Sequence, residues 1–142
     1  MSVLVQISIG TGLLILCAIL HIAMSARLVL LLKTRDALRG LLSGGGIILP
    51  VSVVFAAFVA SHTLHVYLWA VVIWLLGALP GYEEPIYFAL VTYTTVGYGD
   101  VTLTPDFRIL GAMASVTGIL MFGLTTAFLV GVFSGSIGAD PP

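Results

Sequence analysis

Charged side chains are scarce in this sequence. Asp, Glu, Lys and Arg make up 8% of the 142 residues, whereas ordinary soluble domains carry about 25%. Hydrophobic residues reach 60%, and the mean hydropathy is +1.21. This balance excludes an ordinary water-soluble domain and indicates an integral membrane protein. The net charge is −1 and there is no basic surface, so nucleic acid is not expected as a partner.

Cysteine and reactive groups are equally sparse. Cys17 is the single cysteine, so an intrachain disulfide is excluded. We find no nucleophile–base pair, no nucleotide-binding loop and no metal-ligand cluster, and we expect neither an enzyme nor a nucleotide-binding protein. A voltage-sensing helix is excluded too, because four of the five cations are irregularly spaced near the end of one apolar run. They are Arg27, Lys33, Arg35 and Arg39.

Long apolar runs are what the sequence does contain. Residues 3–32, 47–79 and 107–133 are each long enough to cross a bilayer, for which about 20 apolar residues suffice. Residues 84–94 are too short to cross, so we expect a helix that enters from outside and stops midway. The predicted fold is an all-α membrane protein with three transmembrane helices and one re-entrant helix.

The cations predict the orientation of these helices. Lys33, Arg35 and Arg39 lie in residues 33–46, between the first two apolar runs. The positive-inside rule places this connection in the cytoplasm. In the cell membrane, the N-terminus would then lie outside and the C-terminus in the cytoplasm.

A polar stretch interrupted by glycines, residues 92–100, follows the short helix and precedes the last apolar run. Gly97 and Gly99 can adopt backbone conformations with φ > 0 that other residues reach only at a cost. Alternation of such residues with ordinary ones lets successive carbonyl oxygens point toward one axis, and Thr95 adds a hydroxyl oxygen. Four copies around that axis would form a stack of oxygen cages that can replace the water shell of a cation.

Residues 95–99, Thr-Val-Gly-Tyr-Gly, resemble the selectivity filter of the tetrameric potassium channel pore family. The flanking threonines and Asp100 fit the wider pattern of that family. The resemblance implies a homotetramer in membrane lipid that closes a fourfold pore, with K⁺ as the permeant ion. It also implies that Thr95 binds K⁺ through its carbonyl and hydroxyl oxygens, and that the Tyr98 ring braces the filter. The remaining ligands would be the backbone carbonyls of Val96, Gly97, Tyr98 and Gly99.

The resemblance extends to other positions with qualifications. The family has an acid behind the filter where this chain has Val91, so one brace is missing and filter inactivation is left open. Gly118 and Gly123 match glycines of the family's inner helix, and Gly118 stands at its proposed gating hinge. Close helix packing through small residues explains both glycines equally well.

Further residues are expected around the pore. Asp100 and Glu84 would lie at the outer mouth, where acids concentrate cations; for Glu84, a role in starting the short helix is slightly favoured. One face of the last helix would line a water-filled cavity below the filter. That face carries Ile119, Phe122, Gly123, Thr126 and Val130.

Three histidines occupy the apolar runs. His62 and His65 are about one turn apart, and His21 lies in the first run. A pair at this spacing can bind a metal or sense protons. No carboxylate or thiol lies nearby in sequence to complete a site, so hydrogen-bonded packing is favoured.

The chain thus divides into an N-terminal helix with its basic loop (residues 1–42), a pore domain (43–136) and a short cytoplasmic tail (137–142). We predict a potassium-selective channel that conducts passively through a tetrameric pore. Two alternatives stay open: a weakly selective cation channel, and a non-conducting or partner-dependent membrane subunit. The sequence does not indicate the gating stimulus or the role of the extra N-terminal helix.

Overall fold

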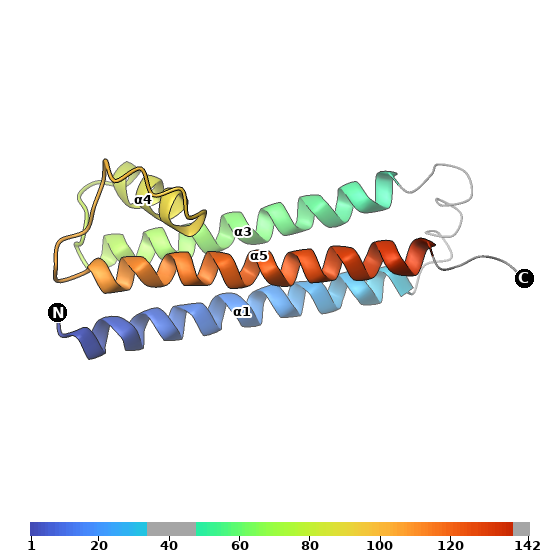
Figure 1. Ribbon diagram of the computed structural model, residues 1–142, viewed down its shortest axis with the longest axis horizontal. Helices are drawn as coiled ribbons and strands as arrows, with labels where there is room; N and C mark the ends of the chain where they lie inside the picture. The colour runs from blue at the N-terminus through green and yellow to red at the C-terminus, as the bar shows by residue number, and fades with distance from the viewer. Residues whose placement is uncertain (34–47, 138–142) are drawn as a thin grey trace, which may run out of the picture.

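Four helices make up the part of the protein that the computed structural model describes, residues 1–33 and 48–137. Helices α1 (Val3–Lys33), α3 (Ile48–Leu75) and α5 (Arg108–Ile137) run along one another, and α4 (Glu83–Tyr93) lies beside one end of them (Figure 1). The expected all-helical fold is confirmed over these residues. The predicted basic connection after Lys33 and the last five residues of the predicted tail lie outside the described part of the chain.

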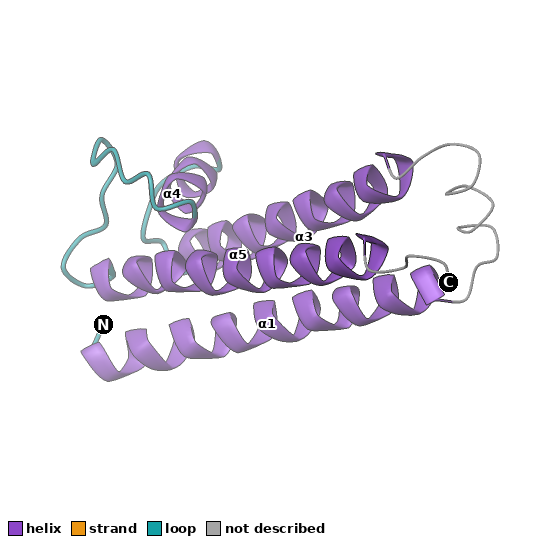
Figure 2. Ribbon diagram, turned by 45° about the vertical axis from the view of Figure 1, so that its right-hand side comes forward, coloured by secondary structure: helices purple, strands orange, loops and turns teal. Residues whose placement is uncertain are grey.

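Three of the helices are long and apolar enough to cross a membrane, as predicted. The qualifying stretches are Val3–Leu31, Val51–Leu75 and Arg108–Gly131. Helix α4 has 11 residues, which corresponds to about 16 Å at 1.5 Å per residue. It is therefore too short for a hydrocarbon core of about 30 Å. In Figure 2, α4 and its two loops stand apart from the row of long helices.

Helix α3 ends four residues earlier than the sequence suggested. The apolar run was expected to stay helical to residue 79, just before the helix-breaking Pro80 and Gly81, but α3 ends at Leu75. Gly77 adopts φ +65°, and its N–H donates to the Trp74 carbonyl at 2.9 Å. The Ala78 N–H donates to the Ile73 carbonyl at 3.1 Å. This pair of hydrogen bonds around a left-handed glycine is a Schellman motif, which satisfies the last carbonyls of the helix and stops it.

Helix α4 begins at a pair of acids. Glu83 and Glu84 form its first turn, where carboxylates interact favourably with the helix dipole. Pro85 follows them, and proline is tolerated in a first turn because the N–H that it lacks has no partner there. The helix spans residues 83–93, one residue earlier than the predicted 84–94.

Helix α1 is attached closely to α5. The Gln6 side chain is buried, and its Oε1 atom accepts hydrogen bonds from the Ile109 and Leu110 N–H groups at 3.1 and 3.2 Å. These N–H groups belong to the first turn of α5 and have no partner within that helix. Further along, a Cβ on Gly10 would lie 2.8 Å from Cγ of Met113, so this glycine permits close approach. The extra helix is thus an integral part of the bundle.

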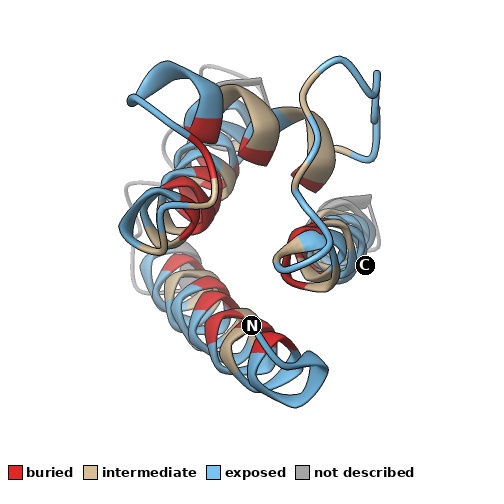
Figure 3. Cartoon of the chain, turned by 90° about the vertical axis from the view of Figure 1, so that its left-hand side faces the viewer, coloured by how far each residue is buried: buried red, intermediate tan, exposed pale blue. Residues whose placement is uncertain are grey.

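The core lies where the helices face one another. In the end-on view of Figure 3, buried residues follow the inner faces, whereas the outer faces are exposed. Trp69 and Tyr93 are the largest fully buried side chains. Many large apolar side chains on the outer faces stay exposed, as expected for helices that lipid surrounds. The main core cluster draws on all four helices: Leu13, Cys17, Val66, Trp69, Ala70, Ala89, Tyr93, Leu110, Ala114 and Met121.

Candidate functional site

The predicted filter, residues 95–99, has an alternating backbone. Thr95, Gly97 and Gly99 have φ values of +62°, +58° and +79°, and the residues between them do not have positive φ. Thr95 is the only described non-glycine residue with positive φ. For a β-branched residue this conformation is a true outlier. It costs about 1–3 kcal/mol, and residues strained in this way occur mostly at functional sites. The alternation expected from the glycine spacing is therefore present and includes Thr95.

The amide groups at the start of the predicted filter point back to α4. The N–H groups of Val96 and Gly97 both donate to the Val91 carbonyl, at 3.0 and 3.3 Å. The Thr95 N–H donates to the Thr92 carbonyl at 3.0 Å. Within the described residues, no hydrogen bond uses the carbonyl oxygens of residues 95–99. These oxygens are therefore available to an external ligand.

The predicted filter is exposed on the single chain. All of residues 95–100 are exposed, and the side chains of Val96 and Tyr98 reach 52% and 74% exposure. The Tyr98 ring, expected to brace the filter, is therefore largely uncovered by the described part of its own chain.

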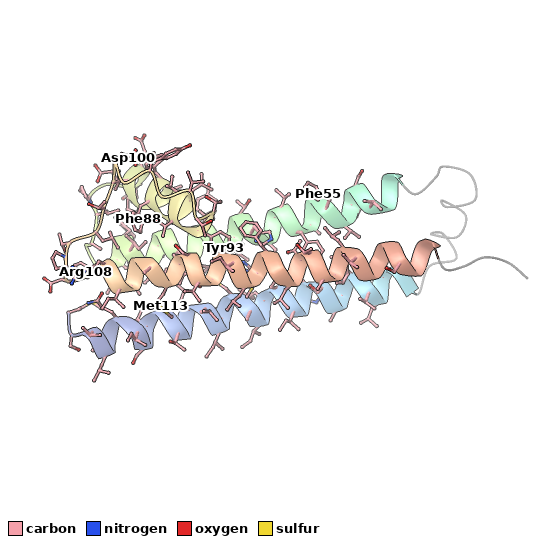
Figure 4. All side chains as sticks on the ribbon, in the orientation of Figure 1. Phe55, Phe88, Tyr93, Asp100, Arg108 and Met113 are labelled. Carbon is pink, nitrogen blue, oxygen red and sulfur yellow. The ribbon has the colours of Figure 1, made fainter. Side chains whose placement is uncertain are left out.

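The residue that follows the predicted filter, Asp100, is hydrogen-bonded to α4. The Tyr87 hydroxyl donates to Oδ2 of Asp100 at 2.5 Å. This hydrogen bond lowers the pKa of the Asp100 carboxyl below its ordinary value. Figure 4 shows Asp100 at the tip of the loop that follows α4, and Tyr93 at the end of α4 that lies close to the long helices. Glu84 is exposed in the first turn of α4.

Gly118 allows α4 to contact α5. A Cβ at this position would overlap the main-chain oxygen of Tyr93. Nearby, the Ser115 hydroxyl donates to the Thr92 carbonyl at 2.9 Å. Close packing, one of the two explanations offered for Gly118, is therefore present. A Cβ on Gly123 would meet nothing within 4 Å, and the hinge role of either glycine stays a prediction.

The residues predicted to line a cavity share an exposed face of α5. Ile119, Phe122 and Val130 are 59%, 41% and 58% exposed, and Thr126 is exposed as well. The Thr126 hydroxyl donates to the Phe122 carbonyl at 2.9 Å. Phe122 also packs within the chain, since its ring stacks on His62 with 4.5 Å between ring centroids. Their role in conduction stays a prediction.

The three histidines meet in the interior, which the sequence analysis did not foresee for His21. The centroid of the His21 ring lies 5.4 Å from that of His62 and 5.6 Å from that of His65. We call these residues the histidine cluster. Among the described residues, no group of three or more His, Cys, Asp or Glu is arranged to hold a metal ion. Each ring of the cluster is hydrogen-bonded to a hydroxyl group, and these bonds support the packing interpretation.

Sequence reasoning also missed the hydroxyl partners of the cluster. They are Ser61, Tyr93 and Thr125, from three different helices. A usable signal existed, because intramembrane ionisable residues are expensive and require a polar partner. That signal says a partner exists without saying which residue it is.

Comparison with known families matches this chain to a family model described as "Ion channel" over residues 53–134. The match begins in α3 and includes all of α4, the predicted filter and most of α5. It leaves out α1. Comparisons with curated proteins and with solved structures found no match.

Proposed function

This chain belongs to the ion channel family, and from that membership we propose that it is a potassium-selective channel working as a homotetramer. Membership makes it a membrane transport protein and not an enzyme. The observation that carries potassium selectivity is the backbone of residues 95–99, with positive φ at every second position and carbonyl oxygens that no described group uses.

Selectivity would follow from replacement of water by these oxygens. A K⁺ ion entering the pore loses its hydration shell, and rings of carbonyl oxygens take the place of the water. Thr95 adds its hydroxyl oxygen to these ligands. Binding must stay weak enough for release, and repulsion between neighbouring ions moves them along. Conduction is passive in this mechanism.

Fourfold assembly is proposed because one chain supplies one row of oxygens. A cage around an ion requires rows from several sides, and each chain has a single predicted filter. The exposure of Val96 and Tyr98 supports this assembly, since apolar and aromatic side chains at such a site call for cover. Each ring would then contain four equivalent oxygens.

Helix α4 would favour a cation through its orientation. Its C-terminal end, at Tyr93, meets the long helices, while its acidic N-terminal end faces the outer loops (Figure 4). A helix C-terminus carries roughly half a negative charge. Four such ends directed at the pore axis would stabilise an ion that is losing its water.

Ion flux from liposomes that carry the purified full-length protein tests the proposal. We expect flux when K⁺ is the only permeant cation, little flux when it is Na⁺, and block of the K⁺ flux by Ba²⁺. Equal K⁺ and Na⁺ flux would overturn selectivity and favour a weakly selective channel. Chemical cross-linking of the purified protein tests the assembly. We expect a tetramer as the largest cross-linked species, and a different limiting size would overturn the fourfold assembly.

A further inference from the structure

The histidine cluster and its hydroxyl partners form one continuous series of hydrogen bonds. His65 Nδ1 lies 3.0 Å from the Tyr93 hydroxyl, which lies 2.9 Å from His62 Nδ1. His62 Nε2 lies 2.9 Å from Oγ1 of Thr125, which lies 3.2 Å from His21 Nε2. His21 Nδ1 then lies 3.1 Å from Oγ of Ser61. Six side chains from α1, α3, α4 and α5 take part.

We infer that this series positions the C-terminal end of α4, and with it the entrance to the predicted filter. The inferred effect on ions rests on the proposed function, whereas the hydrogen-bonded series itself does not. Tyr93 is the residue through which the series acts, because it is the last residue of α4 and stands two positions before Thr95. His62, His65, Thr125 and His21 are positioning residues.

Donor counting makes the series a single unit. A hydroxyl has one hydrogen to donate, and a neutral histidine ring has one N–H donor and one acceptor nitrogen. Tyr93 faces two ring nitrogens, so when it donates to one it accepts from the other. The same holds for Thr125. In the neutral, fully bonded state, all donors point the same way along the series, and the loss of one member changes the tautomer preference of the others.

The surroundings favour neutral rings held by hydroxyls. His21, His65 and Tyr93 are at most 1% exposed. No described carboxylate, lysine or arginine is hydrogen-bonded or ion-paired to the cluster, and the other titratable group of this core is Cys17. The His65 Nε2 atom is buried and makes no hydrogen bond to another described side chain, so the series of side-chain hydrogen bonds ends there. Hydrogen bonds in such an environment are strong, and a missing one is costly.

The series acts at Tyr93, two positions after Val91. The acid expected behind the filter is replaced by Val91, which offers only its main-chain carbonyl to Val96 and Gly97. The main-chain oxygen of Tyr93 lies against Gly118 of α5. The end of α4 is therefore fixed by backbone contact with α5 and by the Tyr93 hydroxyl contact with α3. Thr125 and His21 extend the second attachment to α5 and α1.

Histidine NMR provides a test that does not depend on conduction. The chain has three histidines, all in the cluster, so ¹⁵N-histidine labelling of the full-length protein in lipid reports on this series alone. We expect each wild-type ring to show one protonated and one unprotonated nitrogen. In Tyr93→Phe, which removes only the hydroxyl, the His62 and His65 signals should shift. Tyr67→Phe is the control, because the Tyr67 side chain on α3 is half exposed. In this variant the His62 and His65 signals should stay unchanged. Unchanged spectra in Tyr93→Phe would overturn the series.

Flux measurements test whether the series positions the filter. We expect Tyr93→Phe to reduce the preference for K⁺ over Na⁺ at least about fivefold, corresponding to one net hydrogen bond, while Tyr67→Phe keeps it. A wild type without K⁺ preference would contradict the proposed function alone, because the NMR test still applies. A selective wild type with an equally selective Tyr93→Phe would contradict the positioning role alone.

Two substitutions of His65 separate positioning from packing. His65 uses only Nδ1 in the series, and an asparagine amide can place a polar atom near that position, whereas leucine cannot. We expect His65→Asn to retain most of the K⁺ preference and His65→Leu to lose it, although leucine fills the site with a similar volume. Equal losses in the two variants would indicate a packing role and overturn the inference.

Discussion

The predicted filter and the histidine cluster adjoin at the end of α4, yet they are built in opposite ways. The predicted filter is exposed and depends on main-chain geometry, with positive φ at residues 95, 97 and 99. The cluster is largely buried and depends on side-chain donors and acceptors from four helices. The first should therefore respond most to changes in backbone freedom. The second should respond to the loss of single polar atoms.

The largest effect should come from a substitution that restricts the backbone of the predicted filter. Gly97→Ala places a Cβ on a residue with φ +58°, at a cost of about 1–2 kcal/mol per chain. The cost over four chains is at least about 4 kcal/mol, and every 1.4 kcal/mol is tenfold, so we expect K⁺ flux to fall by roughly several hundredfold. Liposome flux measures this. Gly12→Ala is the control, since a Cβ there meets nothing within 4 Å and φ is not positive; equal flux in both variants would contradict the filter assignment.

The next effect lies at the boundary between the two regions. Gly118→Ala would force the new Cβ against the Tyr93 carbonyl oxygen, and overpacking of this kind costs about 1–3 kcal/mol. We expect a lower melting temperature of the purified protein and a displaced end of α4. Gly123→Ala is the matched control in the same helix, because its Cβ has open space. A normal melting temperature in Gly118→Ala would refute the packing role of Gly118. A change of gating in Gly123→Ala with a normal melting temperature would place the hinge at Gly123.

These two regions also differ in how far the sequence predicted them. The filter spacing is local, so Gly97, Gly99 and Thr95 could be placed from neighbouring residues alone, and the three spans followed from the length of apolar runs. The hydrogen bonds of the histidine cluster join His21 to Ser61 and Thr125, which lie 40 and 104 positions away. Helix periodicity gave the closeness of His62 and His65, but the rotation of α1 about its axis, which brings in His21, depends on packing contacts such as that of Gly10 with Met113.

The end of α3 shows a similar limit on a smaller scale. Pro80 and Gly81 were the more conspicuous helix breakers, yet Gly77 ends the helix through a Schellman motif. An isolated glycine within an apolar run reads equally as a packing residue or as a helix terminator. The two hydrogen bonds to Ile73 and Trp74 decide between them, and they exist only in the folded chain.

A smaller effect should arise where α1 supports the first turn of α5. Gln6→Leu removes the acceptor for the Ile109 and Leu110 N–H groups, and an unsatisfied buried donor costs about 1–3 kcal/mol. We expect a reduced melting temperature with an unchanged K⁺ preference, because Gln6 has no hydrogen bond to the histidine cluster. Ser8→Ala is the control, since its exposed hydroxyl bonds only to the Leu4 carbonyl of its own helix. Loss of K⁺ preference in Gln6→Leu would contradict this expectation. It would show that the Gln6 contact of α1 with α5 also influences the predicted filter.

The smallest effect should be the pH dependence of the hydrogen bond between Tyr87 and Asp100. The Tyr87 hydroxyl lowers the pKa of the Asp100 carboxyl, so the folded protein favours the charged form. The stabilisation is therefore present above the ordinary Asp pKa of about 3.9 and is lost as the pH falls through the lowered value. Tyr87→Phe should move the Asp100 pKa upward, which ¹³C-carboxyl NMR of aspartate-labelled protein measures. Because both side chains face solvent, K⁺ flux at neutral pH should change little, and an Asp100 titration identical in both proteins would show that this hydrogen bond is absent in the membrane.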